Sequence, residues 1–124
     1  MVKVLAIFIG GGLGSILRYM VGILMLKNIH VNFPFATFLV NIVGSFILGF
    51  LYVLFVDKPE MSPALKLALT VGFCGGLTTF STFSLEMFEM IKSAEYIQAV
   101  VYVLLSIIIC VAVVSVGAYC AKLI

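Results

Sequence analysis

Charged residues are scarce in this chain. Only 7 Lys and Arg and 5 Asp and Glu occur among 124 residues, and the net charge is +2. So small and scattered a charge excludes nucleic-acid binding, which needs a clustered basic surface. The single histidine, His30, lies in the polar loop 27–34 without a second metal ligand, so we expect it to be solvated.

Catalytic motifs are also missing. We find no Ser/His/Asp set, no glycine-rich phosphate loop following a strand, and no pair of buried carboxylates suited to acid–base chemistry. The three cysteines, Cys74, Cys110 and Cys120, all lie in apolar segments. An odd number without clustered spacing predicts neither a disulfide framework nor a metal site. An enzyme is therefore not expected.

Apolar residues, in contrast, make up 65% of the chain, and the mean hydropathy is +1.35. Polar interruptions divide the sequence into about four segments, each near the roughly 20 residues that a helix needs to span a bilayer. The fold class predicted is therefore an all-α membrane protein with a single domain over residues 1–124. Four helices enclose little interior, so that a pathway through them needs a second copy.

The predicted spans follow the polar loops. They cover residues of about 2–26, 35–56, 64–92 and 97–121. The first resembles a signal peptide, but no clear cleavage site follows it, and we expect it to be retained. Pro63 is placed to open the third helix. An even number of spans puts Lys3, Lys58, Lys66 and Lys122 on one side, against Lys27 and Lys92 with Arg18 uncertain, which is a weak orientation bias that permits insertion in both directions.

The third span is interrupted. Residues 75–84 read GGLTTFSTFS, with two adjacent glycines and five hydroxyl residues in a hydrophobic segment. Glycine pairs weaken a helix, and Ser and Thr compete for backbone hydrogen bonds. We therefore expect the helix to break at residues 75–79. The backbone groups that the break releases need partners in lipid, from another helix, an ion or water.

The first span carries small residues on one face. Gly10 and Gly14 have the spacing that lets another backbone approach closely, and Arg18 and Gly22 continue this line. Arg18 either extends to the membrane interface or, as we favour because it shares the glycine face, makes a buried contact to carbonyls or carboxylates at a subunit interface.

Asn41 is the informative residue of the second span. A side-chain amide in the hydrocarbon region needs partners, and it can donate to an anion. A hydrogen bond between helices of two subunits explains it equally well. Its face also carries Thr37, Gly44, Ser45, Leu48 and Tyr52.

The polar line through the membrane favours an anion. Cation pathways use rings of carboxylates, and here only Glu86 lies on the line. Phe80 and Phe83 are three residues apart, so they point the same way, and the positive edge of a phenyl ring attracts a small anion weakly. Ordinary helix packing is the competing explanation for the two rings. Tyr102, Ser106 and Cys110 form a stripe in the fourth span.

Three motifs together resemble the Fluc (also called CrcB) family of fluoride channels. They are GGLTTFSTF at 75–83, GGLGSILRY at 11–19 and TFLVNIVGSF at 37–46, and they occur in the expected order over nearly the whole chain. The resemblance implies an antiparallel, dual-topology homodimer in the cell inner (plasma) membrane, with two pathways that export fluoride passively.

The resemblance also implies roles for individual residues. Phe80 and Phe83 would contact fluoride by their ring edges, and Asn41 would contribute to the pathway. The carbonyls of Gly75 and Thr78 would hold a central structural Na⁺ between subunits. The remaining polar positions that the resemblance implies along the pathway are Ser81, Thr82, Tyr102 and Ser106; Arg18 and Gly14 are expected at the interface or in a structural role. The family's stripe can continue with a hydroxyl where this chain has Val114.

Two other functions remain open at this stage. A small four-helix multidrug or cation antiporter needs a membrane-embedded carboxylate, but the first span has none, and Glu86 and Glu89 come late in the third. The second open function is a subunit of a heterodimeric channel. Phe80, Phe83 and Asn41 are all present, which argues against a subunit that has lost its pathway residues.

Overall fold

A computed structural model describes residues 1–28 and 33–124 and shows only helices, turns and connecting segments in these ranges. Four helical stretches in them are long and apolar enough to cross a membrane: Val2–Asn28, Phe35–Asp57, Pro63–Lys92 and Tyr96–Ala121. The all-α, four-span prediction is therefore confirmed. His30 lies outside the described residues.

The elements follow the chain in a simple order. They are α1 (Val2–Asn28), α2 (Phe35–Asp57), α3 (Pro63–Leu67), the π-helix η1 (Ala68–Cys74), α4 (Gly75–Leu77), α5 (Phe80–Lys92) and α6 (Tyr96–Ala121). The third span is thus assembled from four consecutive pieces, whereas the other three spans are uninterrupted helices.

The third span begins as its sequence predicts. Pro63 occupies the first turn of α3, where a missing N–H costs nothing. The hydroxyl of Ser62 accepts a hydrogen bond from the Leu65 N–H at 3.3 Å and caps the helix. At the same end of the molecule, the ammonium of Lys66 donates to the carbonyl of Phe55 at 3.1 Å and ties α3 to the last turns of α2.

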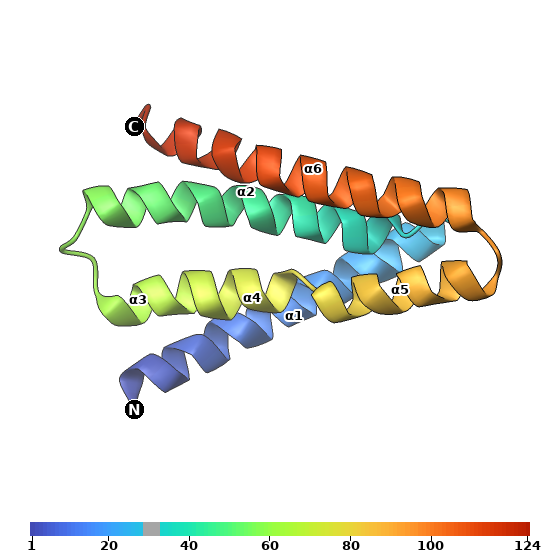
Figure 1. Cartoon of the computed structure of the whole chain (residues 1–124). Helices are drawn as coiled ribbons and strands as arrows, with labels where there is room; N and C mark the ends of the chain where they lie inside the picture. Colours follow the sequence, from blue (N-terminus) through green and yellow to red (C-terminus); the bar gives the residue numbers. More distant parts are fainter. Residues whose placement is uncertain (29–32) are drawn as a thin grey trace.

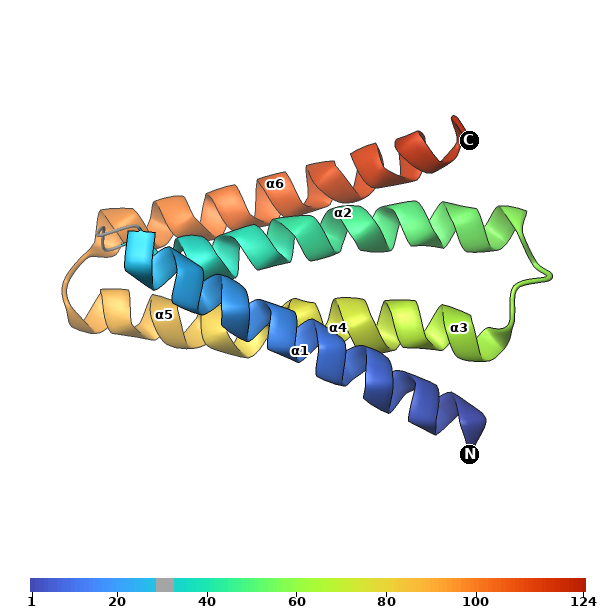
Figure 2. The same cartoon turned by 180° about the vertical axis from the view of Figure 1, so that it is seen from behind.

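The helices form two pairs. Figure 1 shows α2 and α6 side by side, while α1 crosses the pieces of the third span obliquely, as the reverse view in Figure 2 also shows. Both termini and the α2–α3 connection lie at one end of the molecule, and the α5–α6 connection lies at the other (Figure 1). This arrangement places the middle of the third span against the middle of α1.

Glycines allow both pairs to pack at backbone distance. A Cβ on Gly10 would collide with the carbonyl of Ala68, and one on Gly76 with the carbonyl of Gly11. In the other pair, a Cβ on Gly49 would collide with the carbonyl of Val114, and one on Gly117 with that of Phe46. Substitution of these glycines therefore requires backbone movement rather than a change of rotamer.

The break covers fewer residues than the sequence predicted. Gly75 is helical (φ −64°, ψ −35°), and only Thr78 (φ −80°, ψ 157°) and Thr79 (φ −152°, ψ 121°) are extended. The prediction of a break over 75–79 was therefore wrong for its first three residues. Gly76 serves close packing against α1, and the wide turns of η1 come before the glycines rather than at them.

Candidate ion pathway at the break in the third span

Asn41 bonds to both backbone groups of Thr79, the second residue of the break. Its side-chain oxygen accepts a hydrogen bond from the Thr79 N–H at 2.8 Å, and its side-chain nitrogen donates to the Thr79 carbonyl at 3.1 Å. The amide thus replaces both hydrogen bonds that an extended residue loses within a helix. Asn41 therefore bonds within its own chain, with one amide N–H left for another partner.

Arg18 reaches the same break from α1. Its guanidinium donates to the carbonyl of Thr78 at 3.3 Å, and the side chain is half-buried. The contact to a carbonyl that the sequence analysis favoured is thus present, within one chain. Gly14, one turn earlier, is buried where a Cβ would collide with the carbonyl of Phe73, so its close packing is also intramolecular.

The break releases a second carbonyl, that of Gly75. In a continuous helix the Thr79 N–H would bond to it, but this N–H donates to Asn41 instead. A Cβ built on Gly75 would have only one atom within contact range, the carbonyl oxygen of Thr70 at 4.0 Å, so the space where a side chain would stand is open. The carbonyls of Gly75 and Thr78 therefore lie close to the break with acceptor capacity to spare.

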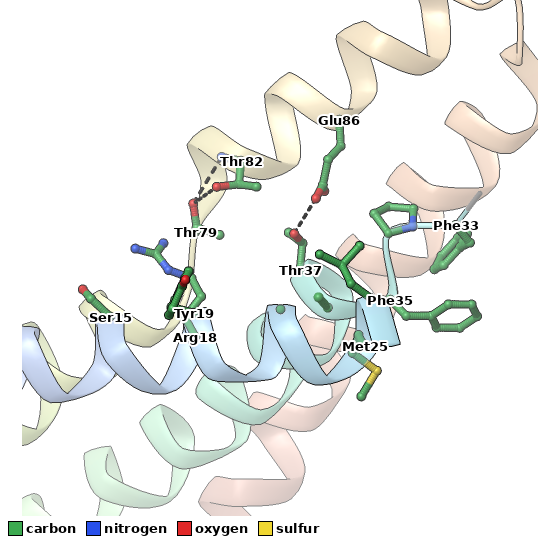
Figure 3. Close-up of a pocket in the computed structure, with 14 residues that line it drawn as sticks. Ser15, Arg18, Tyr19, Met25, Phe33, Phe35, Thr37, Thr79, Thr82 and Glu86 are labelled. Atoms are coloured by element: carbon green, nitrogen blue, oxygen red, sulfur yellow. Dashed lines mark hydrogen bonds between the residues drawn. The ribbon is translucent and has the colours of Figure 1, made fainter. Parts of the chain in front are cut away.

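A cluster of hydroxyls restarts the helix. Thr79 caps α5 by accepting from the Thr82 N–H at 3.2 Å, and its hydroxyl also bonds to those of Thr82 at 3.0 Å and Ser81 at 3.3 Å. Figure 3 shows the Thr79–Thr82 pair. The restart is thereby fixed by side chains, which sets the direction of the first turn of α5, where Phe80 and Phe83 lie.

A cavity of about 460 Å³ opens on one side of the break, and we call it the Phe80 cavity. Residues from α2, the third span and α6 line it: Asn41, Gly44, Ser45, Leu48, Thr70, Cys74, Gly75, Thr78, Thr79, Phe80, Phe83, Ser106, Ile107, Cys110 and Val111. Six predicted site residues, Asn41, Gly75, Thr78, Phe80, Phe83 and Ser106, thus come together from distant parts of the sequence.

The two predicted phenylalanines differ in their surroundings. Phe80 is 79% exposed within the single chain, whereas Phe83 is half-buried and lies against Tyr102 with ring centroids 4.9 Å apart. The rings of Phe80 and Phe83 are 5.6 Å apart and tilted by 34°. Phe83 is therefore held by its own chain, and Phe80 is left open to the bilayer or to another molecule.

A second cavity, of about 550 Å³, lies on the other side of the break; we call it the Arg18 cavity. Figure 3 shows its labelled lining, with Arg18, Ser15 and Tyr19 from α1, Thr37 from α2, and Thr79, Thr82 and Glu86 from the third span. It contains the predicted residues Arg18 and Thr82. Thr79 lines both cavities.

Three polar side chains meet near the Arg18 cavity, a combination that the sequence did not predict. Thr37 donates to one carboxylate oxygen of Glu86 at 2.5 Å, and the hydroxyl of Tyr102 donates to the other at 2.8 Å. Tyr102 itself is fully buried. Each residue is a polar side chain in an apolar span, but they lie on three different helices, and only the fold brings them together.

The remaining predicted residues take separate places. Ser106 lines the Phe80 cavity, and its hydroxyl is buried without a hydrogen-bond partner among the described residues. Ser81 is exposed beside Thr79 and lines neither cavity. Tyr102 reaches the site through its hydroxyl bond to Glu86 and its ring contact with Phe83, and it lines neither cavity.

The fold and this site define a class: a small multi-pass membrane protein with two cavities beside a broken span, each lined partly by polar side chains. The chain matches the family described as "CrcB-like protein, Camphor Resistance (CrcB)" over residues 5–118, and it belongs to that family. The resemblance found in the three motifs is therefore confirmed.

Its relatives are similar over nearly their whole length. A "Fluoride-specific ion channel FluC" of Gloeothece citriformis is 41% identical over 122 residues, covering 98% of each chain. A protein of the same name from Hahella chejuensis is 40% identical over 94% of this chain and 91% of its own. A third, from Phocaeicola vulgatus, is 38% identical over 98% of this chain and 100% of its own.

Proposed function

We propose that this protein is a fluoride-selective ion channel, which lets fluoride leave the cytoplasm passively down its gradient. The observation that carries the proposal is the Phe80 cavity, where Phe80, Phe83, Asn41 and Ser106 converge beside the break. The relatives named as fluoride-specific channels support the identity of the ion and a channel rather than an enzyme.

The lining of the two cavities suits a small anion. The Arg18 cavity offers a guanidinium and the hydroxyl of Thr82, which accepts from the Thr79 hydroxyl and can donate its own hydrogen to an anion arriving from water. The Phe80 cavity offers ring edges, which carry partial positive charge, and the hydroxyl of Ser106. We propose that fluoride passes between the cavities at Thr79, the residue common to both.

We further propose that the working unit is an antiparallel homodimer with two pathways. Two features of the single chain support a second copy: Phe80 is 79% exposed beside its cavity, and the most apolar stretch of α1 is only 11% buried within the chain. Both leave apolar surface for lipid or for a partner. A chain that inserts in both orientations supplies such a dimer without a second gene product, and we expect it in the cell inner membrane.

The carbonyls of Gly75 and Thr78 fit a structural Na⁺. Oxygen ligands suit a hard cation, the Gly75 carbonyl has lost its helical donor, and the Thr78 carbonyl keeps a lone pair besides the one that faces Arg18. An ion bound there would neutralise carbonyl dipoles that lipid cannot solvate. We propose that these residues hold it between the two subunits.

Flux through purified protein in liposomes tests the proposal. Vesicles loaded with fluoride or with chloride salts are diluted into a medium lacking the anion, and efflux is recorded with an ion-selective electrode. We expect fast fluoride efflux and almost no chloride efflux. Equal rates for the two anions would refute selectivity, and no fluoride efflux from verified proteoliposomes would refute the channel.

A further inference from the structure

The Phe80 cavity contains a thiol to which the proposed pathway gives no role. Cys110 lies on α6, one turn after Ser106, and its half-buried side chain lines the cavity. Its thiol is free. Because residues four apart on a helix stand one above the other, Ser106 and Cys110 form adjacent parts of the same wall.

Ser106 shows that this wall is suited to a small polar species. The residue is 8% exposed, and its hydroxyl has no hydrogen-bond partner among the described residues. Buried hydroxyls are normally satisfied, so an unpaired hydroxyl on a residue of the cavity wall indicates a water molecule or a solute as its partner. Whatever small molecule reaches Ser106 arrives within one helical turn of the Cys110 sulfur.

The other two thiols lack this combination. Cys74 lines the cavity from η1 but is only 2% exposed, which leaves an attacking reagent little access. Cys120 is half-buried near the end of α6 and lines neither cavity. Of the three cysteines, only Cys110 is both partly exposed and part of the cavity lining.

We propose that Cys110 is a modification site for small neutral thiol electrophiles, and that its modification closes the pathway. Methyl methanethiosulfonate is a suitable probe. The Cys110 thiolate attacks the sulfenyl sulfur, a new S–S bond forms, and the S–S bond of the reagent breaks. Methanesulfinate leaves with the bonding electrons, and the thiol proton passes to the buffer. The product is a methylthio group on Cys110, attached as a mixed disulfide.

This modification obstructs the cavity in two ways. The added methylthio group occupies volume in the cavity, and it places an apolar group one turn from the Ser106 hydroxyl. A partly dehydrated anion would then lose both room and a donor at the same level of the cavity. The functional half of the proposal rests on the proposed fluoride channel, whereas the reactivity of Cys110 does not.

The test uses full-length protein in liposomes, with fluoride efflux and site-specific mass spectrometry measured on the same samples. After treatment we expect the methylthio group mainly on Cys110 and fluoride efflux lower by about tenfold or more, with recovery after dithiothreitol. Cys110→Ser, scored against its own untreated rate, is expected to be insensitive. Cys120→Ser is the matched control and is expected to keep both wild-type flux and wild-type sensitivity.

The outcomes separate the two proposals. Full flux with Cys110 stoichiometrically labelled, or an undiminished loss in Cys110→Ser, overturns the closure of the pathway by this residue. Labelling of Cys74 or Cys120 ahead of Cys110 overturns the site itself. If untreated vesicles carry no fluoride, the channel proposal fails, yet the order of labelling still decides whether Cys110 is the reactive thiol.

Discussion

At the level of single residues, the site depends on side chains whose chemistry is set by what they touch. Glu86 is the clearest example. Its carboxylate accepts from Thr37 and Tyr102 and is thereby held within the span. The sequence marked Thr37, Glu86 and Tyr102 as polar positions, but nothing in their spacing joins three helices. Such a cluster can be predicted only once the helices have been placed.

The aromatic residues lead to a prediction. Replacing Phe80 or Phe83 by Ile keeps an apolar side chain but removes the ring edge, so we expect fluoride flux to fall by about tenfold or more. Flux is measured in proteoliposomes, and dimer content by size-exclusion chromatography. Phe88→Ile is the matched control, because Phe88 lies on α5, is 57% exposed and lines neither cavity.

Wild-type flux in both Phe80→Ile and Phe83→Ile would show that the two rings contribute only to helix packing. Loss of flux in Phe88→Ile as well would attribute the effect to the fold of α5 and not to the cavity.

At the level of elements, the break was predictable in place but not in width. Residues 75–84 carry the hydroxyls that cap a restarting helix, and Thr79 does cap α5. The glycines, however, are helical, and the missing Cβ of Gly76 lets the third span pack closely against the backbone of Gly11 on α1. A glycine that permits close approach and one that ends a helix look alike in a sequence. The π-helix Ala68–Cys74 was not predicted either, since its wide turns have no composition of their own.

Asn41 carries the element-level prediction. Asn41→Leu removes both hydrogen bonds to Thr79 and leaves an N–H and a carbonyl unpaired inside the membrane, at a cost of about 1–3 kcal/mol each. We expect a lower thermal midpoint in detergent together with loss of flux. Asn28→Leu is the control, because that amide donates to the Leu24 carbonyl at 2.7 Å in an exposed position.

The comparison of the two variants is decisive. If Asn41→Leu unfolds at the same temperature as Asn28→Leu and keeps its flux, the Asn41–Thr79 bonds do not maintain the break.

At the level of the whole molecule, most of each apolar span is not buried within the single chain. Between 11% and 28% of the most apolar stretch in each span is buried within the chain. The composition predicted this arrangement, because a chain of 124 residues that is 65% apolar cannot bury most of its apolar side chains within itself. Which exposed faces meet lipid and which meet a second copy depends on shape, and periodicity carries no information on it.

Sodium dependence tests the proposed assembly. Exchange of Na⁺ for N-methylglucamine at constant ionic strength deprives the carbonyls of Gly75 and Thr78 of their proposed cation. We expect a smaller dimer fraction, measured by cross-linking in detergent, with recovery when Na⁺ is restored. An unchanged dimer fraction under verified sodium depletion would count against the ion at this place.

The wide turns of Ala68–Cys74 also determine where every later residue of the span points. A π-helical turn accommodates one more residue than an α-helical turn, and each residue of an α-helix advances the direction of its side chain by about 100°. If the same seven residues were wound as a regular α-helix, the part that follows would therefore be rotated about the helix axis. Gly76 would turn away from Gly11, and Phe80 would leave the cavity wall. The wide winding of this seven-residue segment therefore sets the direction of the residues after it, and the site requires it as much as it requires the two phenylalanines.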